Sequence, residues 1–583
     1  MTAGFITDWP VSERFPHYTR ANAGEVMGDP VSPLGWTLSW EGAIVLGLRD
    51  GWIRGGTHEI DDFDPDHPET FGMFGGHFYI NLASCRMQGV RNPAVSVEAL
   101  DMAFFGDHPD VPPYVAHPDD DKPHLVPIIE AHTGWVMTAT EWPELLDDKA
   151  AAQELREGRG DLTTYSDAEL VARARSTRPM LHHLFDQHTV SGSSSAIGPG
   201  ILGAVGEAIG DTTISMKLLA GIGDVDSALP SYAMWDMSRR IRASEALTAA
   251  FDAGVHAADG TTVLDRLRAD DSPEAAELVA DWDAFIAEFG SRGPNEWDIH
   301  ADSWETRPEL ALAALDRVRF QDDDESPHLR HRAVAAQREA VTAEVRAKVA
   351  DNAELAGMVE GALVAGNMMA YRERTKTTIV KVVHEGRMVA RELGRRHAEA
   401  GNIAEEGHIF MLLEKELDDF VADPASFRET LAARADEYAA LWDLEPPFII
   451  ADGEVPPLSA WAKKTESGAT AEVAGAEIVG ISGSPGVVTG TARVVLDPAD
   501  PFALDPGDIL VAPYTDPSWT PLFMTAGGVV VNVGGQISHA VIVSRELGLP
   551  CVVSATDATS RIPDGATVEV DGNTGVVTVI ATP

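Results

Sequence analysis

The sequence predicts a multidomain α+β protein, with a large, mainly helical domain followed by a C-terminal β/α domain. Three observations predict this. The 583 residues exceed the length of a single ordinary domain. Between about residues 140 and 445, apolar residues recur at three- and four-residue spacing, which is typical of helices. After about residue 476, short Val/Ile/Thr runs alternate with Gly, Pro and Asp, which is typical of strands and turns.

The elements divide the chain into three parts. Residues 1–451 form the helical domain, which begins with Gly-, Pro- and aromatic-rich segments and includes one expected strand near Phe78–Leu82. Residues 452–476 are rich in Pro, Ser and Gly and are expected to be a linker. Residues 477–583 form the β/α domain, in which one helix is expected from His539 to about Leu547, before a glycine and a proline.

Composition excludes several classes of partner. The net charge is −48, from 44 basic and 92 acidic side chains, so nucleic acid and anionic lipid surfaces are not expected partners. No apolar run is long enough to span a membrane, and the N-terminus does not resemble a secretion signal. The two cysteines, Cys85 and Cys551, lie far apart in sequence, which argues against a disulfide framework. These features predict a cytoplasmic protein.

The segment around His539 has the features of a phosphate site. A Val-rich strand at 529–533 is followed by Gly534 and Gly535, and Ser538 stands where a helix N-cap is expected. The N–H groups and the dipole of a helix start stabilise an anion and favour a neutral, nucleophilic imidazole at His539. The alternative is that this histidine only contacts a loop at the start of a helix.

The wider sequence favours the phosphate interpretation. Residues 477–583 resemble the swivelling phosphohistidine domain of the phosphoenolpyruvate-utilising enzymes. The motifs that carry this resemblance are Gly483-Ser-Pro-Gly486, Gly507-Asp-Ile-Leu-Val511, Thr515-Asp-Pro517 with Trp519-Thr-Pro521, Ser538-His-Ala540 and Arg545-Glu-Leu-Gly-Leu-Pro550. The resemblance implies that His539 accepts the phosphoryl group and that Gly534, Gly535 and Ser538 cradle it.

The resemblance also implies a donor. The chain ends soon after His539, which leaves no room for the pyruvate-binding barrel of the phosphoenolpyruvate enzymes. It has no GxxxxGK[ST] loop and begins directly with sequence of the acceptor domain. We therefore expect ATP and Mg²⁺ to bind a separate ATP-grasp partner subunit that phosphorylates His539.

Residues from about 15 to 450 loosely resemble the middle domain of rifampicin phosphotransferases and of two-subunit enzymes that phosphorylate phenols, such as phenylphosphate synthase. The sharper matches are Asp29–Leu34, Leu218–Asp224, Phe289–Asp298 and Tyr371–Lys376. In the last of these, Arg372 and Lys376 share one face of a helix and are expected to clamp the phosphoryl group; the alternative is a solvated basic face.

Other candidate residues are more ambiguous. Arg292 is either a second clamp or the ion-pair partner of Glu296, and Glu296 or Asp298 is a candidate to orient or deprotonate the acceptor hydroxyl. Trp36 and Phe78 either line an apolar substrate pocket or belong to the core. His182, His183 and His188 have poor spacing for ligands on one helix face, so no metal site is predicted.

The expected function is transfer of a phosphoryl group from His539 to a hydroxyl of a small apolar alcohol or phenol. One alternative is an antibiotic (rifamycin-like) phosphotransferase component. Another is a non-enzymatic binding or regulatory protein that has kept the fold. The residues leave open the identity of the acceptor, the general base, the oligomeric state and any role for the three histidines at 182–188.

Overall fold

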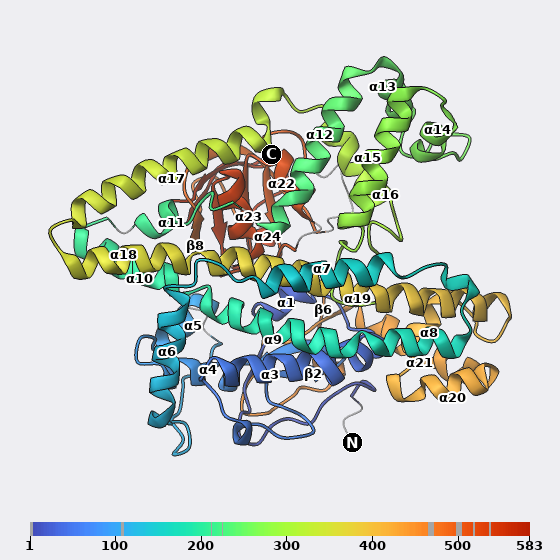
Figure 1. Cartoon of the computed structure of the whole chain (residues 1–583), viewed down its shortest axis with the longest axis horizontal. Coiled ribbons are helices and arrows are strands. Elements are labelled where there is room, and N and C mark those ends of the chain that lie inside the picture. The colour runs from blue at the N-terminus through green and yellow to red at the C-terminus, as the bar shows by residue number, and fades with distance from the viewer. Residues whose placement is uncertain are drawn as a thin grey trace. The chain divides into compact units, whose positions relative to one another are not determined.

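The computed structural model describes residues 4–105, 110–211, 213–223, 225–464, 472–496, 504–516, 519–535 and 538–583. Its contacts divide the chain into two compact units (Figure 1). The first unit comprises Met1–Ile197, Trp297–Ala301 and Arg374–Gly468, and the second comprises Gly198–Glu296, Asp302–Glu373 and Ala469–Pro583. This division differs from the predicted domains, because residues 198–296 and 302–373 group with the C-terminal β/α domain rather than with the N-terminal segments.

The first unit is built from helices and a small antiparallel sheet of order β2-β3-β1-β5. Strands β2 and β3 form a hairpin whose turn, Gly75–Gly76, has φ angles of 55° and 68°. Two successive positive φ values favour glycine, which explains the Gly-Gly pair. The expected strand near Phe78–Leu82 is β3. The strands of this unit are β1 (Tyr18–Thr19), β2 (Phe71–Phe74), β3 (His77–Asn81), β4 (Leu444–Glu445), β5 (Ile449–Ile450) and β6 (Ala462–Lys463).

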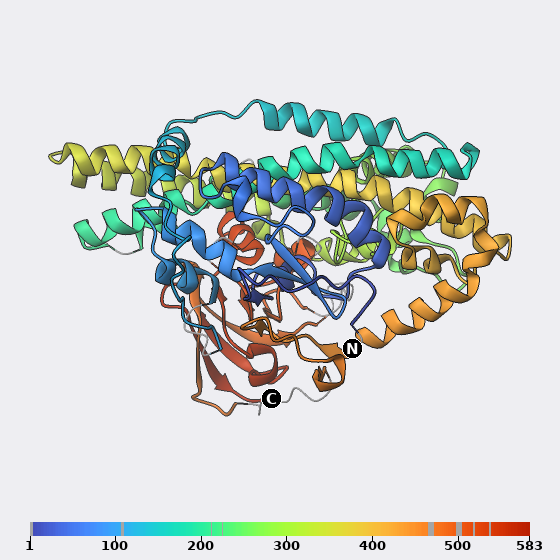
Figure 2. The same cartoon turned by 90° about the horizontal axis from the view of Figure 1, so that it is seen from below.

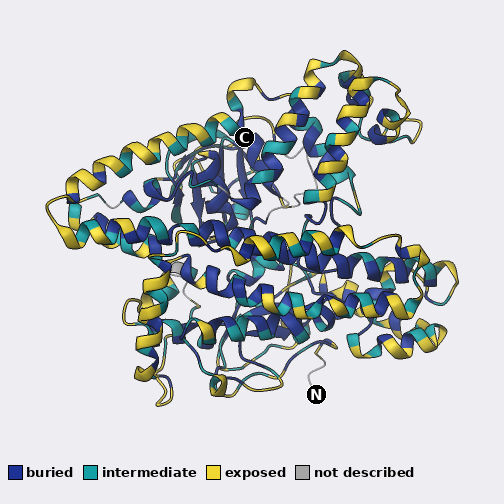
Figure 3. Ribbon diagram, in the orientation of Figure 1, coloured by how far each residue is buried: buried dark blue, intermediate teal, exposed yellow. Residues whose placement is uncertain are grey.

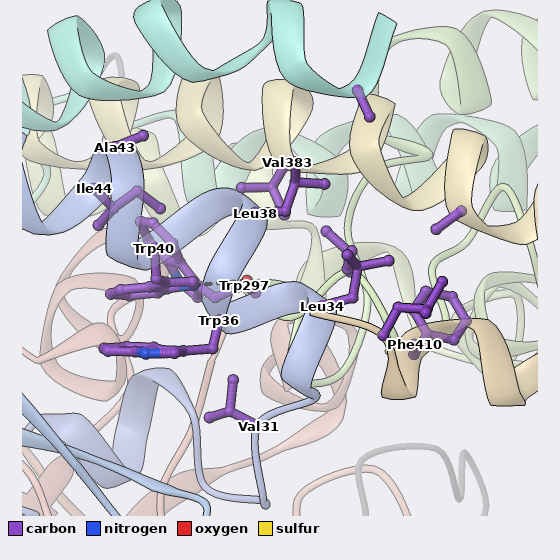
Figure 4. Packing of buried hydrophobic residues seen from close by; sticks show 14 of the residues in the cluster. Val31, Leu34, Trp36, Leu38, Trp40, Ala43, Ile44, Trp297, Val383 and Phe410 are labelled. Carbon is purple, nitrogen blue, oxygen red and sulfur yellow. Dashed lines mark hydrogen bonds between the residues drawn. The ribbon is translucent and has the colours of Figure 1, made fainter. Parts of the chain in front are cut away.

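Helices of the first unit pack around an aromatic core. A π-helix, η1 (Trp36–Ile44), lies between α2 (Pro33–Gly35) and α3 (Val45–Arg54) and turns two indole rings into this core (Figure 4). The remaining α-helices are α1 (Ala23–Val26), α4 (Leu82–Arg91), α5 (Val97–Phe105), α6 (Val126–Val136), α7 (Glu144–Glu157), α8 (Asp167–Ser176), α9 (Arg178–Ser194), α20 (Leu417–Ala422), α21 (Arg428–Leu441) and most of α19 (Asn367–Glu399).

The second unit has a helical part, residues 198–296 and 302–373. Its elements are α10 (Ile197–Ile209), α11 (Ile214–Leu218), the 3₁₀-helix η5 (Asp226–Ala228), α12 (Leu229–Ala243), α13 (Glu245–Asp252), α14 (Val263–Ala269), α15 (Pro273–Phe289), α16 (Glu309–Val318), α17 (Pro327–Val349), α18 (Ala353–Ala365) and the start of α19. The apolar periodicity of the sequence therefore predicts the helical character of this region correctly.

The C-terminal domain, residues 477–583, contains an eight-stranded sheet of order β7-β14-β13-β9-β10-β11-β12-β8 (Figure 2). The four adjacent strands β9 to β12 pair in parallel, and the strands outside them pair antiparallel. This arrangement confirms the predicted multidomain α+β class. The elements are β7 (Glu477–Val479), β8 (Ile481–Ser484), β9 (Val487–Val494), β10 (Ile509–Ala512), β11 (Gly528–Val531), β12 (Cys551–Val553), β13 (Thr567–Asp571), β14 (Val576–Ala581), α22 (Thr520–Thr525), α23 (His539–Leu547) and α24 (Ala558–Arg561).

Helix α23 joins the two parts of the second unit. Every residue from His539 to Leu547 is buried, and the helix is dark in Figure 3. It packs along α17 of the helical part, and Ile542 belongs to the same apolar cluster as Leu219 and Val345. The second unit thus holds the C-terminal domain docked on the helical part. In the described part of the chain, no helix combines the length and apolarity needed to cross a membrane.

Candidate phosphohistidine site

His539 is the first residue of α23 and follows the turn after β11. The Asn532 N–H donates to Ala512 O at 3.0 Å, which fixes the start of the turn on β10. A Cβ atom added at Gly534 would lie 3.1 Å from Ser538 Oγ and 3.3 Å from Val553 Cβ. A larger residue at 534 would therefore require Ser538 or Val553 to shift, which agrees with the tight glycine turn that the sequence predicts. Residues 536–537, between the predicted cradle residues Gly535 and Ser538, lie outside the described residues.

A threonine hydroxyl lies beside each ring nitrogen of His539. Thr515 Oγ1 is 3.1 Å from Nδ1, and Thr520 Oγ1 is 3.5 Å from Nε2. The edge of Phe523 contacts the imidazole, with ring centroids 5.6 Å apart and planes 80° apart. These contacts fix the orientation of a side chain that is only 2% exposed. When Thr515 accepts from Nδ1–H, the lone pair resides on Nε2, where a phosphoryl group can be attacked.

Ser538 differs from its predicted role in one respect. It occupies the N-cap position, with φ −69° and ψ 162°, but its hydroxyl makes no capping hydrogen bond. The hydroxyl oxygen is buried and has no hydrogen-bond partner among the described residues. A buried hydroxyl without a partner is unfavourable unless something satisfies it. Beside the start of α23 and His539, a phosphoryl oxygen is a suitable acceptor for this group.

The sequence reasoning assigned no role to Thr515 or Thr520. Both belong to the motifs that carried the family resemblance, but a hydroxyl in a turn has many ordinary uses. Thr515 follows β10 and Thr520 begins α22, so these elements, rather than sequence proximity, bring both hydroxyls to His539. The usable signal was that β10 and β11 are adjacent parallel strands, whose carboxyl ends lie at one edge of the sheet.

Arg292 and Glu296 form a buried ion pair in the second unit. Arg292 Nη1 donates to Glu296 Oε1 at 2.8 Å, and the two side chains are 1% and 0% exposed. The neighbouring Asn295 N–H lies 3.4 Å from Asp516 Oδ2, in the residue after Thr515. The pair therefore fits the structural alternative, and it also supports a loop that contacts the histidine turn. The proposed clamp and base roles stay predictions.

Asp298 lies in the first unit and holds the start of α2. Its carboxylate accepts from Ser32 N–H at 2.7 Å, Ser32 Oγ at 2.6 Å and His300 N–H at 3.1 Å. Three donors on one buried carboxylate are typical of a structural cap rather than of a proton acceptor. This arrangement favours a structural role for Asp298 over the predicted catalytic one.

Arg372 and Lys376 lie four residues apart on α19, as predicted, at the point where this helix passes from the second unit into the first. The Arg372 guanidinium donates to Glu373 Oε1 at 2.5 Å. Lys376 is only 6% exposed, so the pair is not a solvated basic face. Their predicted contact with the phosphoryl group stays a prediction.

Trp36 and Phe78 are core residues of the first unit, 0% and 2% exposed. Trp36 stacks on Trp40 with centroids 6.2 Å apart, and the Trp40 indole N–H donates to Trp297 O at 3.2 Å (Figure 4). Figure 4 shows the two indoles parallel, between Val31 and Ile44. This packing favours the core interpretation over a pocket lining.

The three histidines on α9 have separate partners. His182 Nε2 lies 2.8 Å from Asp50 Oδ2, His183 Nε2 lies 2.9 Å from Asp148 Oδ1, and His188 Nδ1 lies 2.9 Å from Thr375 Oγ1. The hydrogen bond to Asp148 raises the pKa of His183. Within the described ranges, no group of three or more His, Cys, Asp or Glu side chains could hold a metal ion.

Comparison with known proteins assigns families to two segments of the second unit. Residues 504–575 match the mobile domain of PEP-utilising enzymes, and residues 187–373 match the fourth domain of rifampicin phosphotransferase. The second match nearly coincides with the helical part on which the mobile domain is docked. The C-terminal domain and the helical part of the second unit thus each resemble a domain of proteins in the PEP-utilising group.

Within that group the chain resembles rifampicin phosphotransferase. It is 31% identical over 309 residues to the enzyme of that name from Streptomyces sviceus, which covers 51% of this chain and 34% of the relative. The Bacillus subtilis enzyme is 30% identical, covering 51% and 34%. The "prodigiosin synthesizing transferase PigC" of Serratia marcescens is 32% identical, covering 53% and 34%. The matched region thus spans about a third of each relative.

Proposed function

We propose that this chain is a phosphotransferase component that carries a phosphoryl group on His539 and delivers it to a hydroxyl acceptor. The observation that carries the proposal is the His539 site itself. A buried imidazole has a hydroxyl beside each nitrogen, and the Ser538 hydroxyl, which has no hydrogen-bond partner among the described residues, lies at the adjacent helix start. The similarity to rifampicin phosphotransferases supports the reaction class.

Two displacements at phosphorus make up the proposed reaction. First, a ring nitrogen of His539 attacks the phosphorus of the donor, a P–N bond forms, and the bond from phosphorus to the donor's leaving oxygen breaks. Then the acceptor oxygen attacks the same phosphorus, the P–N bond breaks, and the hydroxyl proton passes to a base. Arg372 and Lys376 are the proposed cations that stabilise charge on the phosphoryl oxygens during transfer.

The proposed donor is ATP bound with Mg²⁺ on an ATP-grasp subunit. This rests on the resemblance to the swivelling phosphohistidine domains. In the docked arrangement His539 is 2% exposed, so phosphorylation by another protein requires the C-terminal domain to leave the helical part. Because the chain carries a net charge of −48, we expect the partner to present a basic face.

The proposed acceptor is a small apolar alcohol or phenol. A rifamycin-like antibiotic is the second candidate, because three of the relatives are named rifampicin phosphotransferase. Another relative is named as a prodigiosin-synthesising transferase, so the relatives of this chain are not all named for rifampicin. Candidate phenols, alcohols and rifampicin can be tested side by side as substrates in one assay.

The decisive experiment compares His539→Ala with the parent chain. Both are incubated with Mg²⁺, γ- and β-labelled ATP and a purified ATP-grasp subunit as the proposed donor. With that donor subunit present, we expect acid-labile, base-stable phosphate on the parent chain and on a His256→Ala control, whose exposed histidine lies elsewhere in the second unit. We expect none on His539→Ala. Equal labelling or equal product formation by His539→Ala would overturn the proposal. A parent chain that never becomes labelled would favour the non-enzymatic alternative.

A further inference from the structure

Glu546 connects the C-terminal domain to the helical part of the second unit. It lies on α23, seven residues after His539, and is 2% exposed. Its Oε1 accepts from the Ile222 N–H at 3.0 Å, and its Oε2 lies 3.3 Å from the Gly223 nitrogen, which also donates. His331 Nδ1, on α17, lies 3.2 Å from Oε2. All three of these partners belong to the helical part.

The turn that receives Glu546 is shaped for a carboxylate. Gly221 and Gly223 have φ angles of 58° and 76°, a conformation that favours glycine. This backbone directs two successive N–H groups to one side, and such converging N–H groups form an anion-binding concavity. The turn belongs to the Leu218–Asp224 segment that the sequence marked as a sharper match; Asp224 lies outside the described residues.

Within its own domain, Glu546 is in an unfavourable position. A carboxylate in the last turn of a helix opposes the helix dipole, and burial of a charge is costly without hydrogen bonds. The bonds that compensate for this burial come from the helical part, so they exist only when the two parts are docked. An interaction of this kind stabilises the docked state specifically, rather than the fold of the domain.

The position of Glu546 couples it to the reactive histidine. His539, Ile542 and Glu546 follow one another at spacings of three and four residues, so they lie on one face of α23. Ile542 on this face packs in the apolar cluster of the helical part. Because α23 is a single short helix that also contacts η5 of the helical part, movement of Glu546 away from the turn would also separate the His539 end of the helix from η5.

We propose that Glu546, the Ile222–Gly223 turn and His331 form a docking latch that holds the C-terminal domain on the helical part while His539 is buried. The latch deepens the proposed function and rests on it: it stabilises the state that delivers the phosphoryl group and opens for the state that receives it. Glu546 is a positioning residue in this scheme and does not contact the phosphoryl group.

A cavity beside the latch makes its opening easier. The cavity has a volume of about 270 Å³ and is lined by residues that include Gly223, Tyr232, His331, Arg332 and Glu546. This is room for several water molecules, at about 30 Å³ each in the liquid. Water in the cavity can solvate the carboxylate as soon as it leaves the N–H groups. The contact is therefore reversible, as a domain that alternates between two positions requires.

The latch can be tested without donor, partner or acceptor. In the full-length chain, diethyl pyrocarbonate modifies exposed imidazoles, and mass spectrometry measures the rate at His539. We expect Glu546→Gln, which removes the charge and one acceptor, to raise this rate about tenfold, and Glu546→Ala to raise it further. The control is Glu477→Gln, at an exposed glutamate of the same domain on β7, where we expect the parental rate.

Circular dichroism and the melting of the variants establish that they fold. With both Glu546 variants folded, a parental rate at His539 would overturn the latch. Should Glu546→Gln unfold, His331→Phe on the helical part decides instead: faster modification of His539 supports the latch and an unchanged rate overturns it.

The outcome is separable from the fate of the proposed function. If the parent chain is never phosphorylated but Glu546→Gln exposes His539, the result supports the latch and contradicts the proposed function. If the function holds, Glu546→Gln should accept phosphate on His539 at least as fast as the parent and should deliver it to the acceptor more slowly. A variant that is impaired in acceptance and normal in delivery would contradict the proposed role.

Discussion

The hydroxyl of Thr515, 3.1 Å from Nδ1 of His539, makes the shorter of the two threonine contacts to the imidazole and is proposed to leave Nε2 as the reactive nitrogen. We expect Thr515→Val to slow phosphorylation of His539 about tenfold, because loss of one hydrogen bond of about 1.4 kcal/mol frees the ring and its tautomer. The measurement is the rate at which acid-labile phosphate appears. Thr520→Val serves as the comparison, since its contact is longer at 3.5 Å and should matter less. A parental rate for Thr515→Val would show that the orientation of the ring is set elsewhere.

Both cysteines are expected to be chemically inert in the folded chain. Burial raises the pKa of Cys85 to about 12, and burial likewise raises the pKa of Cys551 to about 12. At pH 8 only about one thiol in ten thousand is then ionised. In native buffer, we expect neither cysteine to react with a thiol-specific disulfide reagent. In about 6 M guanidinium, which unfolds the chain, we expect both cysteines to react. Rapid native labelling of Cys551 would contradict its placement on buried β12.

Individual residues also show what sequence reasoning could reach. The position of His539 at a helix start was predictable, because glycine favours a turn and serine favours the N-cap position of a helix. The hydroxyls of Thr515 and Thr520 were not, because their role depends on the alignment of β10 and α22 with α23. Likewise, the four-residue spacing of Arg292 and Glu296 suggested an ion pair, but only the fold shows that both side chains are completely buried.

At the scale of elements, α2 depends on a side chain from a distant segment. Asp298→Asn should lower the stability of the first unit by about 2 kcal/mol, because the amide cannot accept all three hydrogen bonds that the carboxylate receives. A drop of several degrees in the thermal midpoint is the expected observation. The control is Asp436→Asn, at an exposed position of α21 in the same unit. Loss of phosphotransfer with an unchanged midpoint would instead support the catalytic role first predicted for Asp298.

Local patterns predicted some elements closely and could not predict others. Helix α23 has the predicted limits: Gly548 ends it locally in a left-handed conformation, and Ser538 stands at the N-cap position although its side chain makes no capping hydrogen bond. The π-helix η1 was not foreseen, since its apolar residues suit an α-helix equally well. Its existence depends on how Trp36 and Trp40 pack against Trp297, which lies 257 residues after Trp40 in the chain.

At the scale of the whole molecule, the sequence predicts domain boundaries from changes in composition. The two compact units of the structure are instead defined by which segments pack together. The linker composition of residues 452–476 precedes the C-terminal domain, although β6 (Ala462–Lys463) within it belongs to the first unit, and this composition carries no information on what the domain packs against. Residues 198–296 and 302–373 look like a continuation of the helical domain in sequence. They join the C-terminal domain because Glu546, Ile542 and Thr520 make contacts there that only long-range packing can bring about.

The stability of the first unit should decrease in mild acid because it contains two buried neutral histidines. Burial lowers the pKa of His58 to about 3 and that of His77 to about 3. Between pH 6.5 and 3 the unfolded state therefore binds protons that the folded state does not, so stability is present above pH 6.5 and is lost as the pH falls through this window. At pH 5 each histidine should reduce the free energy of unfolding by about 2 kcal/mol relative to pH 7.5.

The net charge of −48 acts in the opposite direction, because protonation of carboxylates relieves repulsion as the pH falls. A comparison of variants separates the two effects. His77→Phe removes the titrating group, so the advantage of the parent over this variant at pH 7.5 should shrink by about 2 kcal/mol at pH 5. The matched control is His117→Phe, at a half-exposed histidine of the same unit, for which the difference should stay constant. Thermal and urea unfolding of the three chains at both pH values provide the measurement. If the difference between the parent and His77→Phe does not change with pH, then His77 does not remain neutral in the folded chain, and the acid sensitivity must have another cause.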